Sequence, residues 1–199
     1  IYEGAEAVKE QVRQTLHDLE VSYLDAMLIH WPVPGKFHET WRALERIYRE
    51  KRVRAIGVSN FQIHHLEELS REAEVIPMVN QVELHPLLNQ AELRAVHEQY
   101  SIVTEAYSPL GVGKLLENPA ITTVADAHGK SAAQVLIRWS LQLGNVVIPR
   151  SSNPARIAEN ADVFDFELSE DQIEELTALD KGEAGRRGPN PDTFDWIPK

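Results

Sequence analysis

Short apolar runs rich in β-branched residues alternate with longer amphipathic segments along most of the chain. Regular alternation of this kind indicates parallel strands that are joined by helical crossovers, and so an α/β fold. The apolar runs predict five strands, at Ala26–His30, Arg54–Val58, Met78–Glu83, Ile102–Ala106 and Asn145–Ile148. The amphipathic segments predict helices at Gly4–Leu19, His38–Glu50, Gln62–Arg71, Gln90–Tyr100, Ser131–Leu143, Pro154–Asn160 and Glu170–Leu179.

Capping signals support two of these helices. Ser131 and Ser169 are each followed three residues later by glutamine, which is the arrangement of a capping box. Gly144 stands where the helix that follows Ser131 should end, because glycine readily adopts a left-handed conformation. Residues 26–29 and 146–148 are apolar at successive positions, as expected of a sheet with both faces buried.

Two architectures fit this pattern, a doubly wound sheet and a (β/α)8 TIM barrel. A doubly wound dinucleotide fold opens with a glycine-rich turn after its first strand. The nearest match, Gly111–Gly113, lies far along the chain and lacks the third glycine. A barrel instead places polar residues at the C-terminal ends of successive strands, and we therefore expect a barrel. Such residues follow all five predicted strands: His30, Ser59 and Asn60, Gln81 and Glu83, Tyr107 and Ser108, and Arg150 and Ser151.

A complete TIM barrel has eight strands in ~250 residues, whereas this chain has 199 residues and five predicted strands. The helix at Gly4–Leu19 has no strand before it, and the chain begins with Ile1 rather than Met. We expect residues 1–199 to form a single domain, the C-terminal five strand–helix units of a barrel whose first three units are missing. Residues 182–199 are rich in glycine, proline and arginine and are expected to form a C-terminal loop.

The net charge narrows the range of partners. The 31 acidic and 20 basic side chains give a formal charge of −11, which disfavours binding to nucleic acid. No apolar run approaches the ~18 residues that a membrane span needs, so we expect no membrane insertion. The chain has no cysteine, which excludes disulfides, thiolate metal sites and cysteine nucleophiles and agrees with a cytoplasmic location.

The segment Ile148–Asn160 carries the strongest chemical signal. Arg150 and Ser151 follow the fifth predicted strand, and Arg156 lies in the first turn of the next helix. Two guanidinium groups, hydroxyls and the backbone N–H groups of a helix N-terminus suit a phosphate. The residue types leave open a second interpretation, a solvated turn in which Ser and Asn cap the helix.

Three other strand ends carry groups that could contact a ligand, each with a structural alternative. His30 could donate a hydrogen bond to a substrate oxygen, or be a core histidine. Ser59 and Asn60 could bind an amide or a hydroxyl, or cap the following helix. Tyr107 could stack on an aromatic ring beside a loop through which backbone approaches a pyrophosphate, or pack in the core.

The remaining polar residues suggest no site, and we predict no metal ligand. His64 and His65 are adjacent, so their side chains are expected to point apart on a helix, without the spacing of a metal-binding pair. An unrelated barrel such as a glycosidase would need two facing carboxylates at strand ends. Glu83 and Glu105 are the candidates for that role, which is the weakest of the alternatives.

Taken in order, these motifs resemble those of the aldo-keto reductases over nearly the whole chain. KRVRAIGVSNF (51–61) and IPRSSNPARIAEN (148–160) resemble two signatures of the family. YLDAMLIHWP (23–32), VNQVELHP (79–86) and EAYSPLG (105–111) are also typical of it. The most similar group includes the bacterial 2,5-diketo-D-gluconate reductases. The resemblance implies a TIM barrel and an NADPH-dependent reduction of aldehydes or ketones of small substrates to alcohols by hydride transfer.

The resemblance also implies roles for individual residues. His30 would be the catalytic histidine that orients the substrate carbonyl, and Trp31 would wall the substrate pocket. The nicotinamide carboxamide would be held by Ser59, Asn60 and Gln81, with Tyr107 stacked on the ring. The remaining cofactor contacts would be Ser108, Leu110 and Gly111 at the pyrophosphate, Arg150, Ser151 and Arg156 at the adenosine 2′-phosphate, and Glu159 with Asn160 at the adenine. Arg150 stands where the family more often has Lys, and either cation suits a phosphate.

One part of the family pattern is absent from these residues. The family's Tyr acid, with the Lys and Asp that tune it, comes from the N-terminal part of the barrel. Tyr2 leads straight into the first predicted helix and is not expected to replace that acid. A second hypothesis is therefore a truncated, non-catalytic barrel fragment that binds nucleotide or self-associates through an open sheet edge. A full-length member is expected to be a cytoplasmic monomer.

Overall fold

All five strands predicted from the sequence are present in the computed structural model, which describes residues 4–194. They are β1 (Leu24–Ile29), β2 (Val53–Ser59), β3 (Val79–Glu83), β4 (Val103–Tyr107) and β5 (Val146–Ile148), each within two residues of its predicted bounds. The sheet order is β1-β2-β3-β4-β5, so strands that follow one another in the chain are neighbours in the sheet. The pairs β1–β2, β2–β3 and β4–β5 are parallel, as a sheet with helical crossovers requires.

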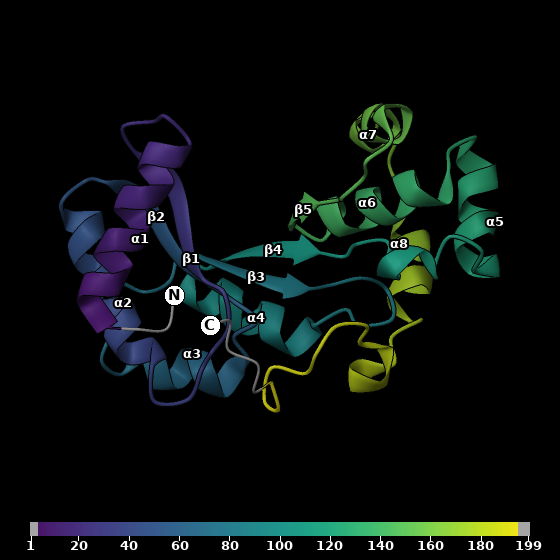
Figure 1. The fold of residues 1–199 in the computed structure, drawn as a ribbon. Helices are drawn as coiled ribbons and strands as arrows, with labels where there is room; N and C mark the ends of the chain where they lie inside the picture. Colours follow the sequence, from purple (N-terminus) through teal and green to yellow (C-terminus); the bar gives the residue numbers. More distant parts are fainter. Residues whose placement is uncertain (1–3, 195–199) are drawn as a thin grey trace. The chain divides into compact units, whose positions relative to one another are not determined.

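Helices occupy most of the segments between the strands (Figure 1). Seven were predicted, and their bounds are α1 (Gly4–Asp18), α2 (Phe37–Arg49), α3 (Ile63–Ser70), α4 (Ala91–Tyr100), α6 (Ala132–Gln142), α7 (Pro154–Ala161) and α8 (Glu170–Thr177). The structure adds α5 (Pro119–His128), which was not predicted, and two 3-10 turns, η1 (Gly111–Gly113) and η2 (Gly182–Gly185). The turn η2 lies in the predicted C-terminal loop, whose residues 195–199 fall outside the described part of the chain.

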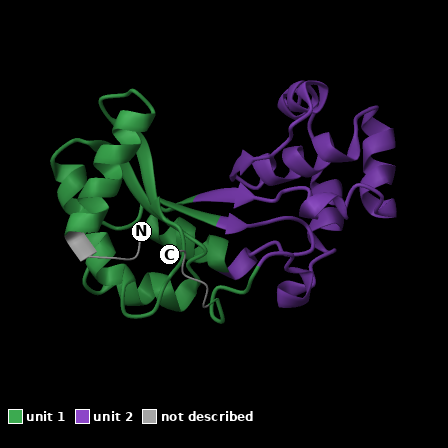
Figure 2. Ribbon diagram, in the orientation of Figure 1, with its two compact units in different colours: residues 1–81, 93–103, 189–199 green, residues 82–92, 104–188 purple. Residues whose placement is uncertain are grey.

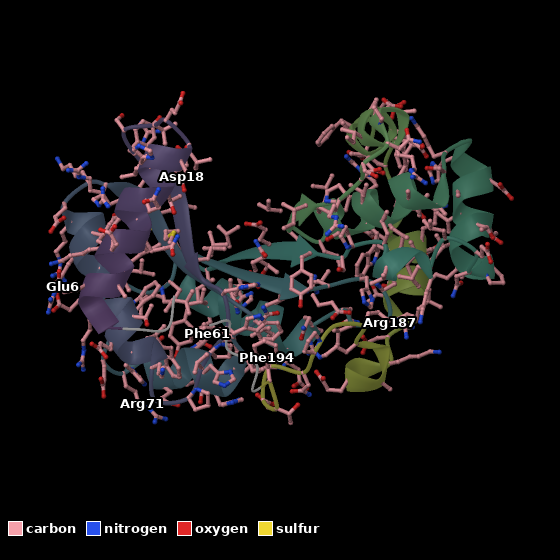
Figure 3. The ribbon with its side chains drawn as sticks, viewed as in Figure 1. Glu6, Asp18, Phe61, Arg71, Arg187 and Phe194 are labelled. Atoms are coloured by element: carbon pink, nitrogen blue, oxygen red, sulfur yellow. The ribbon has the colours of Figure 1, made fainter. Side chains whose placement is uncertain are left out.

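The chain forms two compact units, and β3 and β4 each contribute residues to both (Figure 2). The first unit comprises Ile1–Gln81, Leu93–Val103 and Pro189–Lys199. Within it, α1 packs against α2, and α2 packs against β1 and β2 (Figure 1). The buried apolar residues of α1 recur every four positions, as in an amphipathic helix. Helix α2 and the end of β2 meet in a core around Phe61, which is labelled in Figure 3. The fully buried members of this core include Trp41, Leu44, Ile56, Phe61, Leu66 and Leu69.

The second unit comprises Val82–Glu92 and Thr104–Gly188. Within it, α6 packs against α5, α7 and β5, and α8 packs against α5. Trp139 of α6 is fully buried, and its indole Nε1 donates to the Oγ1 of Thr177 in α8 at 3.0 Å. The core around Trp139 includes Leu84, Leu115, Ile121, Val135, Leu136 and Leu176. Each unit thus encloses its own apolar core.

Local sequence signals explain several boundaries. Ser131 and Ser169 both form the predicted capping boxes, in which the serine side chain accepts from the backbone N–H three residues on. Gly144, at a positive φ of 83°, follows the end of α6 as predicted. Gly57 is required in β2 because a Cβ there would lie 2.5 Å from the carbonyl oxygen of Val79 in β3.

Among residues 4–194, no helix is both long enough and apolar enough to cross a membrane.

Candidate functional site

In the first unit, the ends of β1, β2 and β3 are joined through polar groups that were predicted to form a site. Ser59 Oγ donates to the backbone carbonyl of Gln81 at 2.9 Å, and the Asn60 backbone N–H donates to the same carbonyl at 2.8 Å. Asn60 Nδ2 donates to the backbone carbonyl of His30 and to Ser59 Oγ, each at 3.1 Å. Ser59 and Asn60 are buried and Gln81 is half-buried. The structure therefore brings these four residues together.

Ser59 and Asn60 do not cap α3, which was the structural alternative for this pair. The N-cap is Gln62, whose backbone N–H donates to the Nδ1 of His65 in a capping box. Asn60 instead adopts a left-handed backbone conformation with φ at 63°, which asparagine tolerates better than most residues. This turn directs the Asn60 side chain back to the end of β1.

His30 follows the last residue of β1, and its side chain is exposed rather than packed in the core. Loss of hydration from the surrounding protein lowers the pKa of His30 below its ordinary value. The imidazole is therefore neutral near pH 7, with one N–H available to donate and one nitrogen available to accept. A neutral imidazole at an exposed strand end suits hydrogen bonding to a ligand oxygen.

Trp31, next in the chain, is buried by an aromatic residue that the sequence did not point to. The ring of Phe194 stacks on the Trp31 indole, with centroids 4.0 Å apart and an interplanar angle of 16°. Phe194 belongs to the C-terminal loop and is labelled in Figure 3. The sequence separation of these residues explains why no local pattern predicted the contact.

In the second unit, Tyr107 ends β4 and a tight turn follows it. Tyr107 is half-buried, and burial together with the negative charge of Glu83 raises the pKa of its phenol to about 12. Ser108 and Gly111 have positive φ values of 50° and 54°, and the Gly111 N–H donates to the Ser108 carbonyl at 2.9 Å. Leu110 is half-buried and Gly111 is buried against Leu115. The Gly111 N–H, one of the backbone donors expected to face a pyrophosphate, is thus already hydrogen-bonded within the turn.

The segment after β5 forms the capped turn, which was one of the two interpretations that the sequence left open. Asn153 caps α7, with its Oδ1 accepting from the N–H of Ala155 at 2.9 Å and of Arg156 at 3.5 Å. Ser151 Oγ accepts from the Asn153 N–H at 3.2 Å. The solvated, capped turn is therefore real, and it occupies backbone donors that the phosphate interpretation would use. The guanidinium groups of Arg150 and Arg156 are exposed and form no ion pair within residues 4–194.

An apolar hollow of about 310 Å³ lies beside this segment in the second unit. Asn160, in the last turn of α7, is nearly buried and lines the hollow, and Glu159 beside it is half-buried. The other lining residues are almost all apolar and include Ile137, Val147, Pro149, Ile157 and Phe164. A pocket with apolar walls and one amide is suited to a flat heteroaromatic ring.

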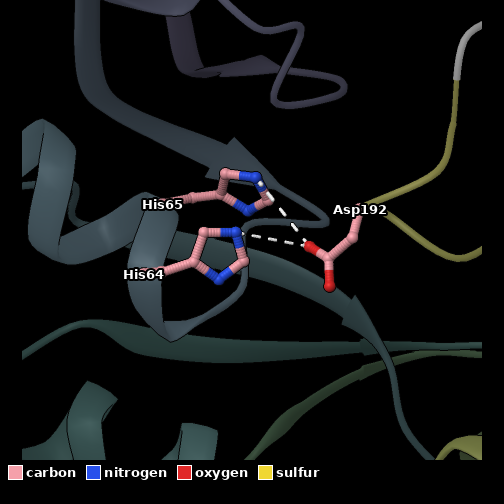
Figure 4. A group of neighbouring side chains, drawn as sticks. All are labelled: His64, His65 and Asp192. Carbon is pink, nitrogen blue, oxygen red and sulfur yellow. Dashed lines mark ion pairs between the residues drawn. The ribbon is translucent and has the colours of Figure 1, made fainter.

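The two adjacent histidines of α3 do not point apart, and that prediction was wrong. The ring centroids of His64 and His65 lie 3.9 Å apart, because side-chain torsions that adjacency does not fix turn the two rings toward each other. Asp192 Oδ1 lies 3.4 Å from His64 Nε2 and 4.0 Å from His65 Nε2 (Figure 4). These three side chains have the ligand spacing of a metal site.

The hydrogen bonding of His65 argues against that use. Its Nδ1 accepts the Gln62 N–H at 3.1 Å, so the neutral ring carries its proton on Nε2, the nitrogen that a metal would need. Burial, followed by the charge of His64, lowers the pKa of His65 to about 4. The group therefore fits a polar contact between α3 and the C-terminal loop better than a metal centre.

One of the two carboxylates that the glycosidase alternative needs, that of Glu83, is engaged by hydrogen bonds within the protein. Glu83 is buried and accepts three hydrogen bonds from its own protein, and Glu105 is half-buried in β4. Tyr2, which was not expected to act as an acid, lies outside the described residues.

The alternation of strand and helix and the polar groups at the strand ends define an α/β protein of the TIM-barrel class, with five of its strand–helix units in these residues. Residues 4–181 match the Aldo/keto reductase family. The chain belongs to this family of oxidoreductases, as its motifs predicted.

Relatives and solved structures agree with this assignment. The chain is 53% identical over 190 residues to the glyoxal reductase of Bacillus subtilis (strain 168), covering 96% of this chain and 68% of that protein. It is 52% identical over 196 residues to an aldo-keto reductase of Mycobacterium sp. (strain JLS), covering 98% of this chain and 70% of that protein. The crystal structure of a Gox0644 mutant in complex with NADPH is similar with a TM-score of 0.94 and 42% identity, covering 97% of this chain and 72% of that one.

Proposed function

We propose that this chain is the NADPH-binding part of a carbonyl reductase that reduces aldehyde or ketone groups of small substrates to alcohols. The observation that carries the proposal is the pair Arg150 and Arg156. On a chain of net charge −11, both guanidinium groups are exposed beside the N-terminus of α7 without a carboxylate partner among the described residues. Such a pair suits the 2′-phosphate that distinguishes NADPH from NADH.

The residues that contact the other parts of the cofactor are assigned by family resemblance, and local features of the second unit support these assignments. Asn160 and Glu159 lie at or beside an apolar hollow that suits the adenine ring. Ser151 Oγ accepts one hydrogen bond and keeps its proton to donate to a phosphate oxygen. Ser108, Leu110 and Gly111 are assigned to the pyrophosphate, and Tyr107 to the face of the nicotinamide. Bound NADPH would supply the hydride.

In the first unit, Ser59, Asn60 and Gln81 are assigned to the nicotinamide carboxamide. Ser59 and Asn60 are buried and fixed by hydrogen bonds to the backbone of neighbouring strands, which gives the preorganisation that an amide-binding site needs. His30 would donate the N–H of its neutral ring to the substrate carbonyl oxygen and orient it. The stacked pair Trp31 and Phe194 would wall the substrate side.

Tyr107 is not the acid that protonates the resulting alkoxide. Its pKa, raised to about 12, makes it a poorer proton donor than an ordinary tyrosine, whereas a catalytic acid works best with a pKa near the operating pH. We assign Tyr107 to stacking alone, and we assign no proton donor among residues 4–194.

The working unit that we propose is a single domain acting as a monomer in the cytoplasm on small carbonyl compounds. The acidic net charge supports solubility and disfavours nucleic acid as a partner.

The reductase proposal is tested by following NADPH consumption with glyoxal and a panel of small aldehydes and ketones. We expect turnover that falls by about 100-fold or more in His30→Ala, because a positioned hydrogen-bonding group at the carbonyl is worth about that much. Affinity for NADPH should be unchanged in that variant, which separates the catalytic role from the binding role. Failure of the unmodified protein to bind NADPH would contradict the proposal, whereas NADPH binding without turnover of any carbonyl would favour the alternative of a non-catalytic fragment.

A further inference from the structure

Glu83, the last residue of β3, holds a buried carboxylate that the proposed reaction does not use. Its side chain is inaccessible to solvent, and it accepts three hydrogen bonds within the second unit. His85 Nε2 donates to Oε1 at 3.0 Å, and the backbone N–H groups of Arg187 and Gly188 donate at 2.6 and 2.7 Å. Two of these three donors come from residues more than 100 positions along the chain.

The Glu83 carboxylate is ionised in this environment. Burial by itself would raise the pKa of Glu83, but the hydrogen bonds from His85, Gly188 and Arg187 outweigh it and lower the pKa. His85 is also fully buried, and its other ring nitrogen, Nδ1, has no hydrogen-bond partner. The ring thus directs its Nε2 to Glu83, and the Glu83 carboxylate in turn accepts from the backbone N–H groups of residues 187 and 188.

Residues 181–188, which include Arg187 and Gly188, also pack closely against the loop after β3. The Lys181 N–H donates to the carbonyl of Leu87 at 3.0 Å. A Cβ at Gly185 would lie 1.7 Å from that same carbonyl oxygen, so this position admits glycine alone. The Arg186 guanidinium donates two hydrogen bonds to the Glu183 carboxylate, each 2.7 Å long. We call Lys181–Gly188 the anchored segment.

The anchored segment passes the hydroxyl end of Tyr107. A Cβ built on Gly188 would lie 3.5 Å from Tyr107 Oη and 3.0 Å from Glu83 Oε2. The Leu84 N–H, next to Glu83, donates to the carbonyl of Tyr107 at 3.2 Å. The backbone of Tyr107 is therefore held by Leu84, the residue after Glu83. Its hydroxyl lies beside Gly188, whose N–H donates to Glu83.

We infer that Glu83 is a positioning residue: its carboxylate, tied to His85, binds the backbone of Arg187 and Gly188, keeps Gly188 beside the hydroxyl end of Tyr107 and so holds that ring in place for stacking. The inference rests on the proposed function, in which Tyr107 contacts the nicotinamide. Two charge-assisted hydrogen bonds to consecutive N–H groups are strong enough to hold a backbone that has no regular secondary structure. Glu83 itself touches no substrate.

The test combines amide hydrogen exchange with NADPH titration in Glu83→Gln, Glu83→Asp and Arg187→Pro. Gln keeps the shape but loses the charge, and Asp keeps the charge. Arg187→Pro removes one N–H donor at an exposed residue without altering the core, and it keeps the test informative if Glu83→Gln fails to fold. Glu117→Gln, which removes an exposed carboxylate from the same unit, is the matched control.

We expect the Gly188 amide to exchange at least tenfold faster in Glu83→Gln and in Arg187→Pro than in the unmodified protein. NADPH affinity should fall about fivefold or more in both variants, with partial recovery in Glu83→Asp and no change in Glu117→Gln. Unchanged exchange at Gly188, or faster exchange with unchanged NADPH affinity, would overturn the positioning role. If the unmodified protein binds no NADPH, the proposed function fails, and the exchange data alone then decide whether Glu83 anchors the segment.

Discussion

Asn60 Nδ2 donates a hydrogen bond to the backbone carbonyl of His30 across 3.1 Å and thereby joins the end of β2 to the end of β1. The geometry depends on the left-handed conformation of Asn60, whose φ is 63°. Asn60→Asp should destabilise the protein by about 2 kcal/mol, because a carboxylate oxygen would replace the donor in a buried position. Asn60→Gly, which accepts the same φ, separates loss of the side chain from backbone strain. Equal unfolding free energies for Asn60→Asp and the unmodified protein in urea would contradict this account.

Acid should destabilise the protein through His97 before its carboxylates are protonated. Burial, followed by the charge of Arg94, lowers the pKa of His97 to about 4, and its Nε2 lies 2.9 Å from the donor Nδ2 of Asn80. Because the folded pKa lies below the unfolded value of about 6.5, the unfolded chain binds more protons between those values. The contribution of His97 to the free energy of unfolding is therefore fully present above about pH 6.5. It decreases as the pH falls toward 4, by about 3 kcal/mol.

His97→Gln should remove that part of the pH dependence, and His17→Gln, at an exposed position, should leave it intact. The measurement is the unfolding free energy in urea at several pH values from 7 to 4. A profile with the same slope in His97→Gln as in the unmodified protein would show that another group causes the loss.

The capping box of α8 gives a separate stability prediction. Ser169 Oγ accepts from the Gln172 N–H at 3.3 Å, and Gln172 Oε1 accepts from the Ser169 N–H at 2.9 Å. Ser169→Ala should cost about 1 kcal/mol. The control is Ser152→Ala, an exposed serine whose change should be close to neutral in thermal unfolding. A melting temperature as low for the control as for Ser169→Ala would argue against the cap.

The strands and seven helices were predictable because their signals are local. The alternation of strand and helix, two capping boxes and Gly144 are all visible within a few residues. Helix α5 was missed although it has similar signals: Asn118 caps it, Pro119 opens it, and Gly129 ends it in a left-handed conformation. Its buried residues Ile121, Val124 and Ala125 have helical spacing, but in a helix of 10 residues they form only a short apolar stripe.

The candidate site was predictable only as far as each residue's place at a strand end. Ser59, Asn60 and Tyr107 lie where the sequence placed them, but Ser59 and Asn60 donate to backbone carbonyls at the ends of other strands, those of Gln81 and His30. The stacking of Phe194 on Trp31 and the bonds from Arg187 and Gly188 to Glu83 join positions over 100 residues apart. Such contacts depend on tertiary packing, which no short sequence window encodes. The adjacent rings of His64 and His65 depend on side-chain torsions in the same way.

Binding of NADPH and NADH to the unmodified chain, Arg150→Ala and Arg156→Ala tests the central claim most directly. Each arginine contributes a charge-assisted contact to the 2′-phosphate, so each alanine variant should lose about 2 kcal/mol, or roughly 30-fold, in NADPH affinity. Binding of NADH, which lacks that phosphate, should be weak and nearly unchanged by either substitution. Quenching of tryptophan fluorescence measures both nucleotides. NADPH affinity that survives both substitutions, or falls in parallel with NADH affinity, would contradict the account.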